Sequence, residues 1–351
     1  MSLVKILKHK IGKDAKPFTI AEAGINHNGS IKKAMKMIEV AKLSKVNAIK
    51  FQTYNTDEFI SDIKKKYTYK LNGRYITESM YRIFKRCELS ESEWIRIKKK
   101  CDKEKIIFLS TPSNFNDLKL ILKLKVPAIK IGSDDFNNIP LIKKAKKTKL
   151  PLILSSGMST LKEIETTLKY SGALKGYPVI LMLCISKYPA EPKDVNIERL
   201  KYLKSKYPRI NLGFSDHTQG SAAASLAIAY GARCFEKHFT LNKSDKGPDH
   251  WFSEDKESLS NWVRTINDSF NMLGKSKVFP VKAEKKMRHL ARKSIVASKN
   301  INKGEIISDT NVCFKRPGNG LPPIKFEKIV GMKSKVFIKK NSQIKINFLN
   351  K

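Results

Sequence analysis

Histidines lie beside acidic and small residues in four segments of the sequence. These segments are Ile20–Gly29, Gly213–Thr218, Glu236–Thr240 and Gly247–His250. Two imidazoles at neighbouring strand ends can share one divalent ion, and His217 and His238 are the candidates for that role. Glu22 and Asp249 stand in the same segments and add carboxylate oxygens. The sequence therefore predicts a divalent metal site on His217 and His238, with a ligand set that suits Mn²⁺, Mg²⁺ or Co²⁺.

Two lysines stand inside short apolar stretches that have the pattern of β-strands. Because side chains alternate between the faces of a strand, Lys50 and Gln52 share one face of the first stretch, and Lys130 points inward from the second. By the same alternation Glu236 and His238 lie together. Inward-facing ammonium groups predict an anion site, and the alternative is a buried lysine stem whose ammonium reaches solvent.

The elements that must position these side chains alternate regularly between strand and helix. Eight apolar or β-branched runs, each followed by an amphipathic helical pattern such as Ile31–Leu43 or Leu161–Tyr170, occupy the chain from Phe18 to about Leu273. The predicted strands are Phe18–Ala21, Ala48–Thr53, Ile106–Thr111, Ala128–Ser133, Leu152–Ser156, Val179–Cys184, Leu212–Asp216 and Arg233–Phe239. Eight repeats predict an α/β fold, a (β/α)₈ TIM barrel whose strand ends meet at one mouth.

The pattern changes after about Leu273. We expect residues 1–273 to form the barrel, residues 274–287 to be a Lys-rich linker without apolar phasing, and residues 288–351 to form a small domain. Short strands are predicted in this domain at Ser294–Ala297, Val312–Phe314 and Val336–Ile338, with a Pro- and Gly-rich loop at Arg316–Pro323.

The chain of 351 residues has a formal net charge of +38 at pH 7. Its lysines are spread over nearly every helical stretch, and no nucleic-acid-binding motif is present, so the charge predicts a solvated surface and no nucleic-acid partner. No apolar run of about 18 residues and no signal-like N-terminus occurs, which predicts a cytoplasmic protein without a membrane partner. Five widely spaced cysteines without a CxxC pair predict reduced core thiols.

With these motifs in this order, the chain resembles the sialic acid synthase family, which includes the N-acetylneuraminate, legionaminate and pseudaminate synthases. The resemblance extends from about Phe18 to Leu349. The matching stretches are Glu22–Gly29, Ile49–Thr53, Leu109–Pro112, Lys130–Ser133, Leu154–Met158, Phe214–Thr218, Glu236–Thr240, Gly247–Asp249 and Lys315–Gly320. The last of these looks like the signature loop of the family's C-terminal SAF domain, an antifreeze-like β-clip fold.

The resemblance implies a metal-dependent transferase of sialic acid biosynthesis. It implies that phosphoenolpyruvate condenses with an N-acetylated hexosamine and water, giving a nine-carbon 2-keto sugar acid and phosphate through C–O cleavage. The hexosamine would be N-acetylmannosamine or a 2,4-diacetamido-6-deoxyhexose, which the sequence does not decide. The divalent ion on His217 and His238 would be Mn²⁺ in first place, with Mg²⁺ and Co²⁺ as alternatives.

Roles for other residues come from the same resemblance. Catalytic roles are implied for Glu22, Lys50, Lys130 and Asp249. Substrate contacts are implied for Gln52, Asn72, Thr111, Ser133, Ser155, Ser186, Tyr188, Ser215 and Arg316. Within this set the lysines and most of the hydroxyls would hold phosphoenolpyruvate, and Glu22 would orient or deprotonate water or hold metal-bound water. The SAF domain of this family is swapped across a homodimer, so Arg316 is expected to complete the active site of a partner.

Some stretches depart from the family pattern. Leu183 and Ile185 stand where many members have His and Thr, and Ser186 stands where some have Asn, which bears on phosphate contacts at that strand. Asp134–Phe136 differs from the Gly-Glu-Cys of some relatives, and Lys64–Arg74 is a variable basic region. Two further histidines are not expected to be ligands: His27 would make a loop hydrogen bond, and His250 would lie at the surface or over the pocket.

Two other functions compete with this interpretation. One is a related phosphoenolpyruvate-aldose synthase that makes seven- or eight-carbon keto acids, against which the SAF-like segment argues. The other is a polyanion-binding protein on a barrel scaffold, which would have no need of the inward-facing lysines, the paired histidines and the acidic residues.

Overall fold

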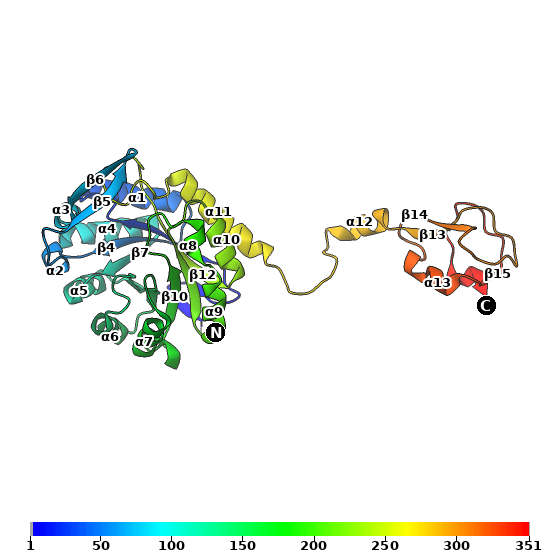
Figure 1. Ribbon diagram of the computed structural model, residues 1–351, viewed down its shortest axis with the longest axis horizontal. Coiled ribbons are helices and arrows are strands. Elements are labelled where there is room, and N and C mark those ends of the chain that lie inside the picture. The colour runs from blue at the N-terminus through cyan, green and yellow to red at the C-terminus, as the bar shows by residue number, and fades with distance from the viewer. Residues whose placement is uncertain (1–2, 351) are drawn as a thin grey trace. The chain divides into compact units, whose positions relative to one another are not determined.

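Eight parallel strands form the central sheet of the chain (Figure 1). The hydrogen-bonded order is β7-β4-β3-β12-β11-β10-β9-β8, so each strand pairs with the next sheet strand along the chain except at β7 and β8, and β12 pairs with β3. Among the described residues, only β7 and β8 meet without a ladder. The strands are β3 (Phe18–Gly24), β4 (Ala48–Thr53), β7 (Ile107–Pro112), β8 (Ile129–Ile131), β9 (Leu152–Ser155), β10 (Val179–Cys184), β11 (Asn211–Asp216) and β12 (Ala232–His238). This topology confirms the predicted (β/α)₈ TIM barrel.

The structure is a computed structural model that describes residues 3–350. It divides into two units, Met1–Gly274 and Lys275–Lys351, and each is described by itself. Among the described residues, no helix is both long and apolar enough to span a bilayer.

Helices follow the strands of the first unit and cover the outside of the sheet (Figure 1). They are α1 (Ile31–Leu43), α2 (Thr56–Phe59), α3 (Met80–Cys87), α4 (Glu91–Glu104), α5 (Phe115–Lys123), α6 (Ile139–Lys147), α7 (Leu161–Ser171), η1 (Ala173–Lys175), α8 (Pro192–Val195), α9 (Arg199–Lys206), α10 (Ala222–Ala229) and α11 (Lys256–Met272). Local sequence explains several of the boundaries. Ser90 with Glu93 and Thr160 with Glu163 form capping boxes that satisfy the first N–H groups of α4 and α7.

Two hairpins in the first unit were not predicted. The first joins β1 (Val4–Ile6) to β2 (His9–Ile11), and the second joins β5 (Lys66–Leu71) to β6 (Arg74–Ser79) within the segment that the sequence marked as variable. The second hairpin lies between β4 and α3, on the side of the barrel where the carboxyl end of β4 points.

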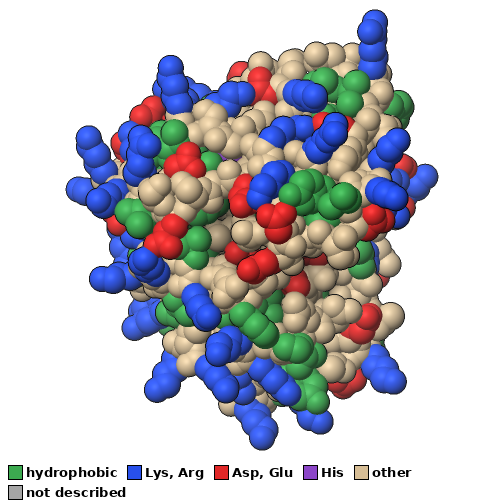
Figure 2. Space-filling model, turned by 90° about the vertical axis from the view of Figure 1, so that its left-hand side faces the viewer, with side chains coloured by type: hydrophobic (Ala, Val, Ile, Leu, Met, Phe, Trp, Pro, Cys, Tyr) green, Lys and Arg blue, Asp and Glu red, His purple; other side chains and the backbone are tan. Residues whose placement is uncertain are grey.

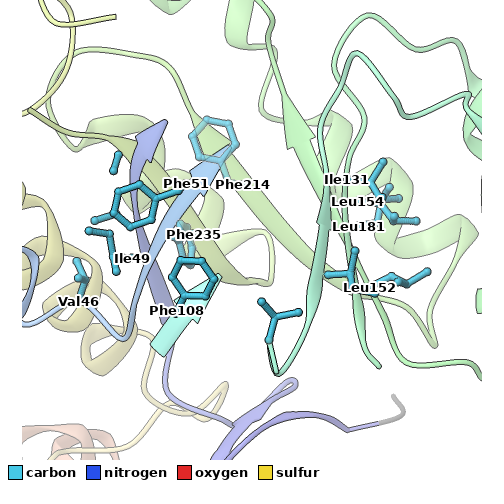
Figure 3. Packing of buried hydrophobic residues seen from close by; sticks show 14 of the residues in the cluster. Val46, Ile49, Phe51, Phe108, Ile131, Leu152, Leu154, Leu181, Phe214 and Phe235 are labelled. Atoms are coloured by element: carbon cyan, nitrogen blue, oxygen red, sulfur yellow. The ribbon is translucent and has the colours of Figure 1, made fainter. Parts of the chain in front are cut away.

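Apolar side chains on the outer face of the sheet make up the main core of the barrel. Figure 3 shows Ile131, Leu154 and Leu181 side by side, as the register of β8, β9 and β10 requires. Each is fully buried, which stabilises the fold by roughly 1.5–3 kcal/mol per side chain. At the amino-terminal end of the barrel, Val4 and Ile6 of the first hairpin pack in a second cluster with inward-facing strand residues. That hairpin therefore closes the end of the barrel opposite the predicted mouth.

Gly213 of β11 lies where the strands approach too closely for a side chain. A Cβ at this position would meet the carbonyl oxygen of Cys234 at 2.7 Å and the Met182 side chain at 2.9 Å. We expect Gly213→Ala to lower the free energy of unfolding by about 1–3 kcal/mol, because the backbone of β12 cannot yield without distorting the sheet. Thermal unfolding measures this effect. Gly12→Ala is the control, because its Cβ would meet the end of the Leu3 side chain at 3.1 Å and Asn211 Oδ1 at an ordinary contact distance of 3.8 Å. Equal unfolding temperatures for Gly213→Ala and the natural protein would contradict the expectation.

The second unit contains two small antiparallel sheets. Its elements are α12 (Glu284–Ala291), β13 (Ser294–Ala297), β14 (Val312–Lys315), η2 (Pro323–Lys325), α13 (Phe326–Ile329), β15 (Lys333–Ser334), η3 (Ile346–Phe348) and β16 (Leu349–Asn350). Helix α12 begins inside the segment predicted as linker. The helix has too few apolar residues to show a helical period in the sequence. The strand predicted at Val336–Ile338 is reduced to a single bridge between Ile301 and Ile338.

Basic side chains cover the surface without forming one patch on the face shown in Figure 2. Lysines and arginines are distributed around that face, and acidic side chains lie among them. This dispersion is the pattern that the sequence predicted for a solvated surface.

Candidate active site

A cavity of about 400 Å³ opens at the carboxyl ends of the barrel strands. It brings together every predicted site residue except Asn72 and Arg316. The predicted residues that line it are Glu22, Lys50, Gln52, Thr111, Lys130, Ser133, Ser155, Ser186, Tyr188, Ser215, His217, His238 and Asp249. They come from all eight strands or from the turns that follow them, which explains how positions so distant in sequence share one site.

Two lysines and two glutamates form the floor of the cavity. Lys50 Nζ lies 2.9 Å from Glu22 Oε2 and 3.6 Å from Glu236 Oε2, and Lys130 Nζ lies 3.3 Å from Glu236 Oε1. All four side chains are almost fully buried. Lys50 also donates to Thr111 Oγ1 at 3.0 Å. The floor therefore presents two ammonium groups whose present partners are carboxylates that an anionic substrate could replace.

The two carboxyl groups of the floor differ in acidity. Burial raises the pKa of Glu22 to about 7, although the Lys50 ammonium opposes the rise. Burial also disfavours ionised Glu236, but Lys130 and Lys50 outweigh it and hold the pKa of Glu236 below its ordinary value. Glu236 is thus the charged member of the pair, and Glu22 can give or take a proton near neutral pH.

His217 and His238 stand side by side at the ends of β11 and β12, with ring centroids 5.4 Å apart. The Nδ1 atom of His217 lies 2.7 Å from the Ile185 carbonyl oxygen, so it carries the proton and leaves Nε2 free. Burial, with help from His217 and the floor lysines, holds the pKa of His238 well below its ordinary value. Burial also opposes the charged form of His217, but Cys184 and the hydrogen bond to the Ile185 carbonyl group outweigh it and raise the pKa of His217. His238 therefore offers an unprotonated ring to an ion, and His217 offers Nε2 in its neutral form.

The donor set fits a divalent ion that takes only part of its coordination from the protein. Nδ1 of His238 is buried without a hydrogen-bond partner and lies 3.8 Å from Asp249 Oδ2. Within residues 3–350, no three or more His, Cys, Asp or Glu side chains are grouped so that they could hold an ion. Two imidazoles would thus need oxygen ligands from water or substrate, as in open metal sites.

Hydroxyl groups line the side of the cavity near Lys130. The Oγ atoms of Ser155 and Ser186 are buried and have no hydrogen-bond partner among the described residues. Gly157 makes room for Ser186 and Ser133, because a Cβ there would lie 2.4 Å from Ser186 Oγ and 2.6 Å from Ser133 Oγ. Buried hydroxyls without partners carry a desolvation cost that a bound anion would relieve. The unpartnered hydroxyls are consistent with an anion site, although Leu183 and Ile185 depart from the family pattern in and after β10.

Tyr188 covers the paired histidines. Its ring lies 4.3 Å from the His217 ring and 5.2 Å from the Phe252 ring, measured between centroids. Tyr188 remains 39% exposed, so it is part of the cavity wall rather than of the core. Asp249 lies beside His238, and burial raises the pKa of Asp249 to about 6.

Asn72 does not reach the cavity. It is exposed at the turn between β5 and β6, where it and Gly73 have φ values of 47° and 81°. An Asn-Gly pair with positive φ at both positions is the usual two-residue hairpin turn, and this backbone role explains the residue. The prediction of a substrate contact from Asn72 is therefore not supported by its position in this chain.

Arg316 belongs to the second unit, where it is exposed after β14. Its role in the site of a partner stays a prediction.

The two motif histidines that were not expected to be ligands, His27 and His250, are buried. His27 accepts a loop hydrogen bond from the Gly29 N–H at 3.1 Å, as expected. His250 is only 1% exposed and lies 2.7 Å from Thr240 Oγ1, so the predicted surface or lid position is wrong.

Sequence reasoning left several cavity residues out of the predicted site. Glu236 was recognised as inward-facing, but its place between both floor lysines was not. Strand alternation with His238 was the signal that could have added it. Apolar side chains from the segment after β4 also line the cavity, and they are Tyr54, Phe59, Tyr67, Met80, Ile83 and Phe84. No motif marked them, because aromatic residues in a variable segment are also typical of a core.

Two family models match the chain. The model of the NeuB family matches residues 37–278, and the model of the SAF domain matches residues 292–350. The first match contains most of the cavity residues, and the second falls within the second unit.

Related proteins cover most of the chain. The N,N'-diacetyllegionaminic acid synthase of Legionella pneumophila is 35% identical over 90% of this chain and 89% of its own length. The enzyme of the same name from Campylobacter jejuni is 37% identical over 90% of this chain and 95% of its own length. A solved structure of N-acetylneuraminic acid (sialic acid) synthetase from Leptospira borgpetersenii, in complex with citrate, is 33% identical with a TM-score of 0.73. It covers 81% of this chain and 94% of its own.

Proposed function

Because this chain belongs to the NeuB family, as its sequence predicted, we propose that it is a nonulosonic acid synthase. The reaction joins C3 of phosphoenolpyruvate to the aldehyde carbon of an open-chain N-acetylated hexosamine. Water adds at C2, and phosphate leaves with its bridging oxygen. The observation that carries the proposal is a single cavity in which paired ammonium groups, unpartnered hydroxyls and two adjacent imidazoles lie together.

Phosphoenolpyruvate binds at the floor in this proposal. Its phosphate and carboxylate replace the carboxylates around Lys50 and Lys130 and accept hydrogen bonds from the Ser155 and Ser186 hydroxyls. Charge-assisted hydrogen bonds of this kind are the strong ones, and the buried floor excludes the water that would weaken them. Glu236 contacts both lysines and holds them in place until the substrate arrives.

The aminosugar binds over the histidines, toward Tyr188 and Asp249. A divalent ion on His217 and His238 supplies Lewis-acid polarisation of the aldehyde oxygen when it is bound. Asp249 accepts hydrogen bonds from sugar hydroxyls, and the Tyr188 ring bounds the space above His217. Glu22, whose pKa is raised to about 7 by burial, takes the proton from the water that adds to C2.

A direct test is phosphate release from phosphoenolpyruvate with the full chain. We expect release with an N-acetylated hexosamine, its loss with a chelator, and its return with Mn²⁺. Acceptors for the assay are N-acetylmannosamine and the 2,4-diacetamido-6-deoxyhexoses, and mass spectrometry of the product gives its carbon number. No release with any of these acceptors, or an eight- or seven-carbon product from another aldose, would contradict the proposal.

Arg316 gives a test of assembly. We propose a homodimer in which Arg316 completes the site of the partner, because its planar guanidinium offers a fork of donors to carbonyl and hydroxyl oxygens. Arg316→Ala is expected to be inactive alone and to recover partial activity when mixed with inactive His238→Ala. If subunits exchange and no activity returns, the role across subunits fails. The predicted cytoplasmic location stays a prediction.

A further inference from the structure

A buried ion pair lies directly behind the two histidines. Asp216 and Lys237 immediately precede His217 and His238, and they are register partners in the ladder between β11 and β12. Because Glu236 and His238 face the cavity, strand alternation turns Lys237 to the opposite face, toward the helices. The exposed fractions of the Lys237 and Asp216 side chains are 2% and 0%.

The Lys237 ammonium contacts four acceptors. Its Nζ lies 3.0 Å from Asp216 Oδ2, 2.9 Å from the Gly220 carbonyl oxygen and 3.5 Å from Glu254 Oε1, and it also donates to the Thr218 carbonyl oxygen. The ammonium therefore ties the end of β12 to the turn that follows β11. His217 is the first residue of that turn.

Asp216 fixes the same turn from its other side. Its Oδ1 accepts hydrogen bonds from the Thr218 N–H at 2.9 Å and the Thr218 hydroxyl at 2.7 Å. Its Oδ2 accepts a hydrogen bond from the Trp262 indole N–H of α11 at 3.0 Å. In the turn that begins at His217, Asp216 thus accepts from the Thr218 N–H, and Lys237 donates to the Thr218 and Gly220 carbonyl groups.

Glu254 extends the arrangement to the segment that carries Asp249. The Glu254 N–H donates to the His238 carbonyl oxygen at 2.9 Å, and the Thr240 N–H donates to the Glu254 carbonyl oxygen at 2.8 Å. The Glu254 carboxylate meets Lys237. One ammonium group therefore connects the backbone segments of His217, His238 and Asp249.

We propose that Lys237 is a positioning residue, which holds His217 and His238 in the relative placement that a shared divalent ion requires. The inference rests on the proposed function. A buried ion pair is weak evidence for stability, because the cost of desolvation offsets the Coulomb attraction. The hydrogen bonds from Lys237 to the Thr218 and Gly220 carbonyl groups, in the turn that begins at His217, give this pair a geometric role instead. Loss of groups that orient metal ligands commonly weakens metal affinity 10–100-fold, and we expect about that effect.

The same strand provides a matched control. Arg233 lies four positions earlier in β12 on the same face, is 7% exposed, and donates to the carbonyl oxygens of Lys13, Ile228 and Ala232. Arg233→Met and Lys237→Met each remove one buried cation that holds backbone carbonyl groups. Of the two cations, only Lys237 stands beside the histidines. General destabilisation would therefore affect both variants, whereas misplacement of the histidines would affect only Lys237→Met.

The experiment measures Mn²⁺ affinity by electron paramagnetic resonance of the free ion, without turnover, and records KM, kcat and thermal unfolding beside it. We expect Lys237→Met to bind Mn²⁺ about 10–100-fold more weakly and to lose kcat more than affinity for phosphoenolpyruvate. Arg233→Met is expected to keep its Mn²⁺ affinity even if it unfolds at a lower temperature.

Lys237→Met leaves Asp216 as a buried charge without its ammonium partner, and this variant could therefore fail to fold. A second variant keeps the proposal testable in that case. Lys237→Met combined with Asp216→Asn neutralises both members of the pair and is expected to show the same loss of Mn²⁺ affinity. Natural affinity in either folded variant, or an equal loss in Arg233→Met, would overturn the proposal. A different result would count against the proposed metal site itself. In that case the natural protein would show no Mn²⁺ binding that is lost in His238→Ala.

Discussion

Replacing His238 with alanine is expected to lower turnover by at least ~10²-fold while the barrel stays folded, because the aldehyde oxygen loses its charge-stabilising element. His217→Ala is expected to have the same effect. Neither change strands a buried charge, since burial keeps the His238 imidazole neutral and the His217 ring bonds to a carbonyl group. Steady-state turnover with saturating Mn²⁺, beside circular dichroism for the fold, measures the effect.

The control for this prediction is a histidine at the far end of the barrel. His9 lies in the first hairpin, where its ring meets Phe18 edge-on with centroids 5.4 Å apart. His9→Ala is expected to retain natural turnover. Full activity of both His217→Ala and His238→Ala in chelator-treated buffer would show that the paired histidines hold no ion needed for the reaction.

Replacing Lys130 with methionine is expected to weaken the apparent affinity for phosphoenolpyruvate by about 10²-fold, in the range found when one preorganised charge is lost. The methionine keeps most of the stem volume, but it leaves Glu236 with Lys50 and the Ser215 hydroxyl as its partners. The affinity for the aminosugar is expected to change much less, because that substrate binds over the histidines. Initial rates with each substrate varied in turn measure the two affinities.

Lys50→Met is the companion variant, and it is expected to act in the same direction. Lys98→Met is the control, because Lys98 pairs with Asp102 on the surface of α4. Such a pair is expected to contribute little. Equal losses of affinity for both substrates in Lys130→Met would argue that the lysine supports the whole cavity rather than the anion site.

Periodicity predicted the barrel well, because its strands are short apolar runs whose inward residues alternate with outward ones. β4 and β10 have the predicted bounds, and α1 does as well. The same alternation assigned Lys50 and Lys130 to the inside. The first hairpin was not predicted because three-residue strands are too short to show a pattern. Val4 and Ile6 are buried only against strand residues of the folded barrel, which the local sequence does not reveal.

The site was harder to predict where it depends on how loops fold back. Asn72 follows the sequence pattern of a contact residue only loosely, and its Asn-Gly turn takes it to the tip of a hairpin. Glu236 was missed as a site residue because its role depends on two lysines from other strands. The Lys237 contacts were beyond sequence reasoning for the same reason, since a buried lysine has no recognisable pattern without its acceptors.

Among the described residues, the hydrophobic clusters of the barrel share no residue with the cluster around Ile295, Ile301 and Ile344 in the second unit. Heat therefore acts on two cooperative blocks, and a calorimeter should record two endotherms where their melting points differ. A single midpoint fitted to the whole chain would then describe neither block. Substitutions in the sheet, Gly213→Ala among them, should displace the barrel endotherm more than the other endotherm, which then serves as an internal reference in the same sample.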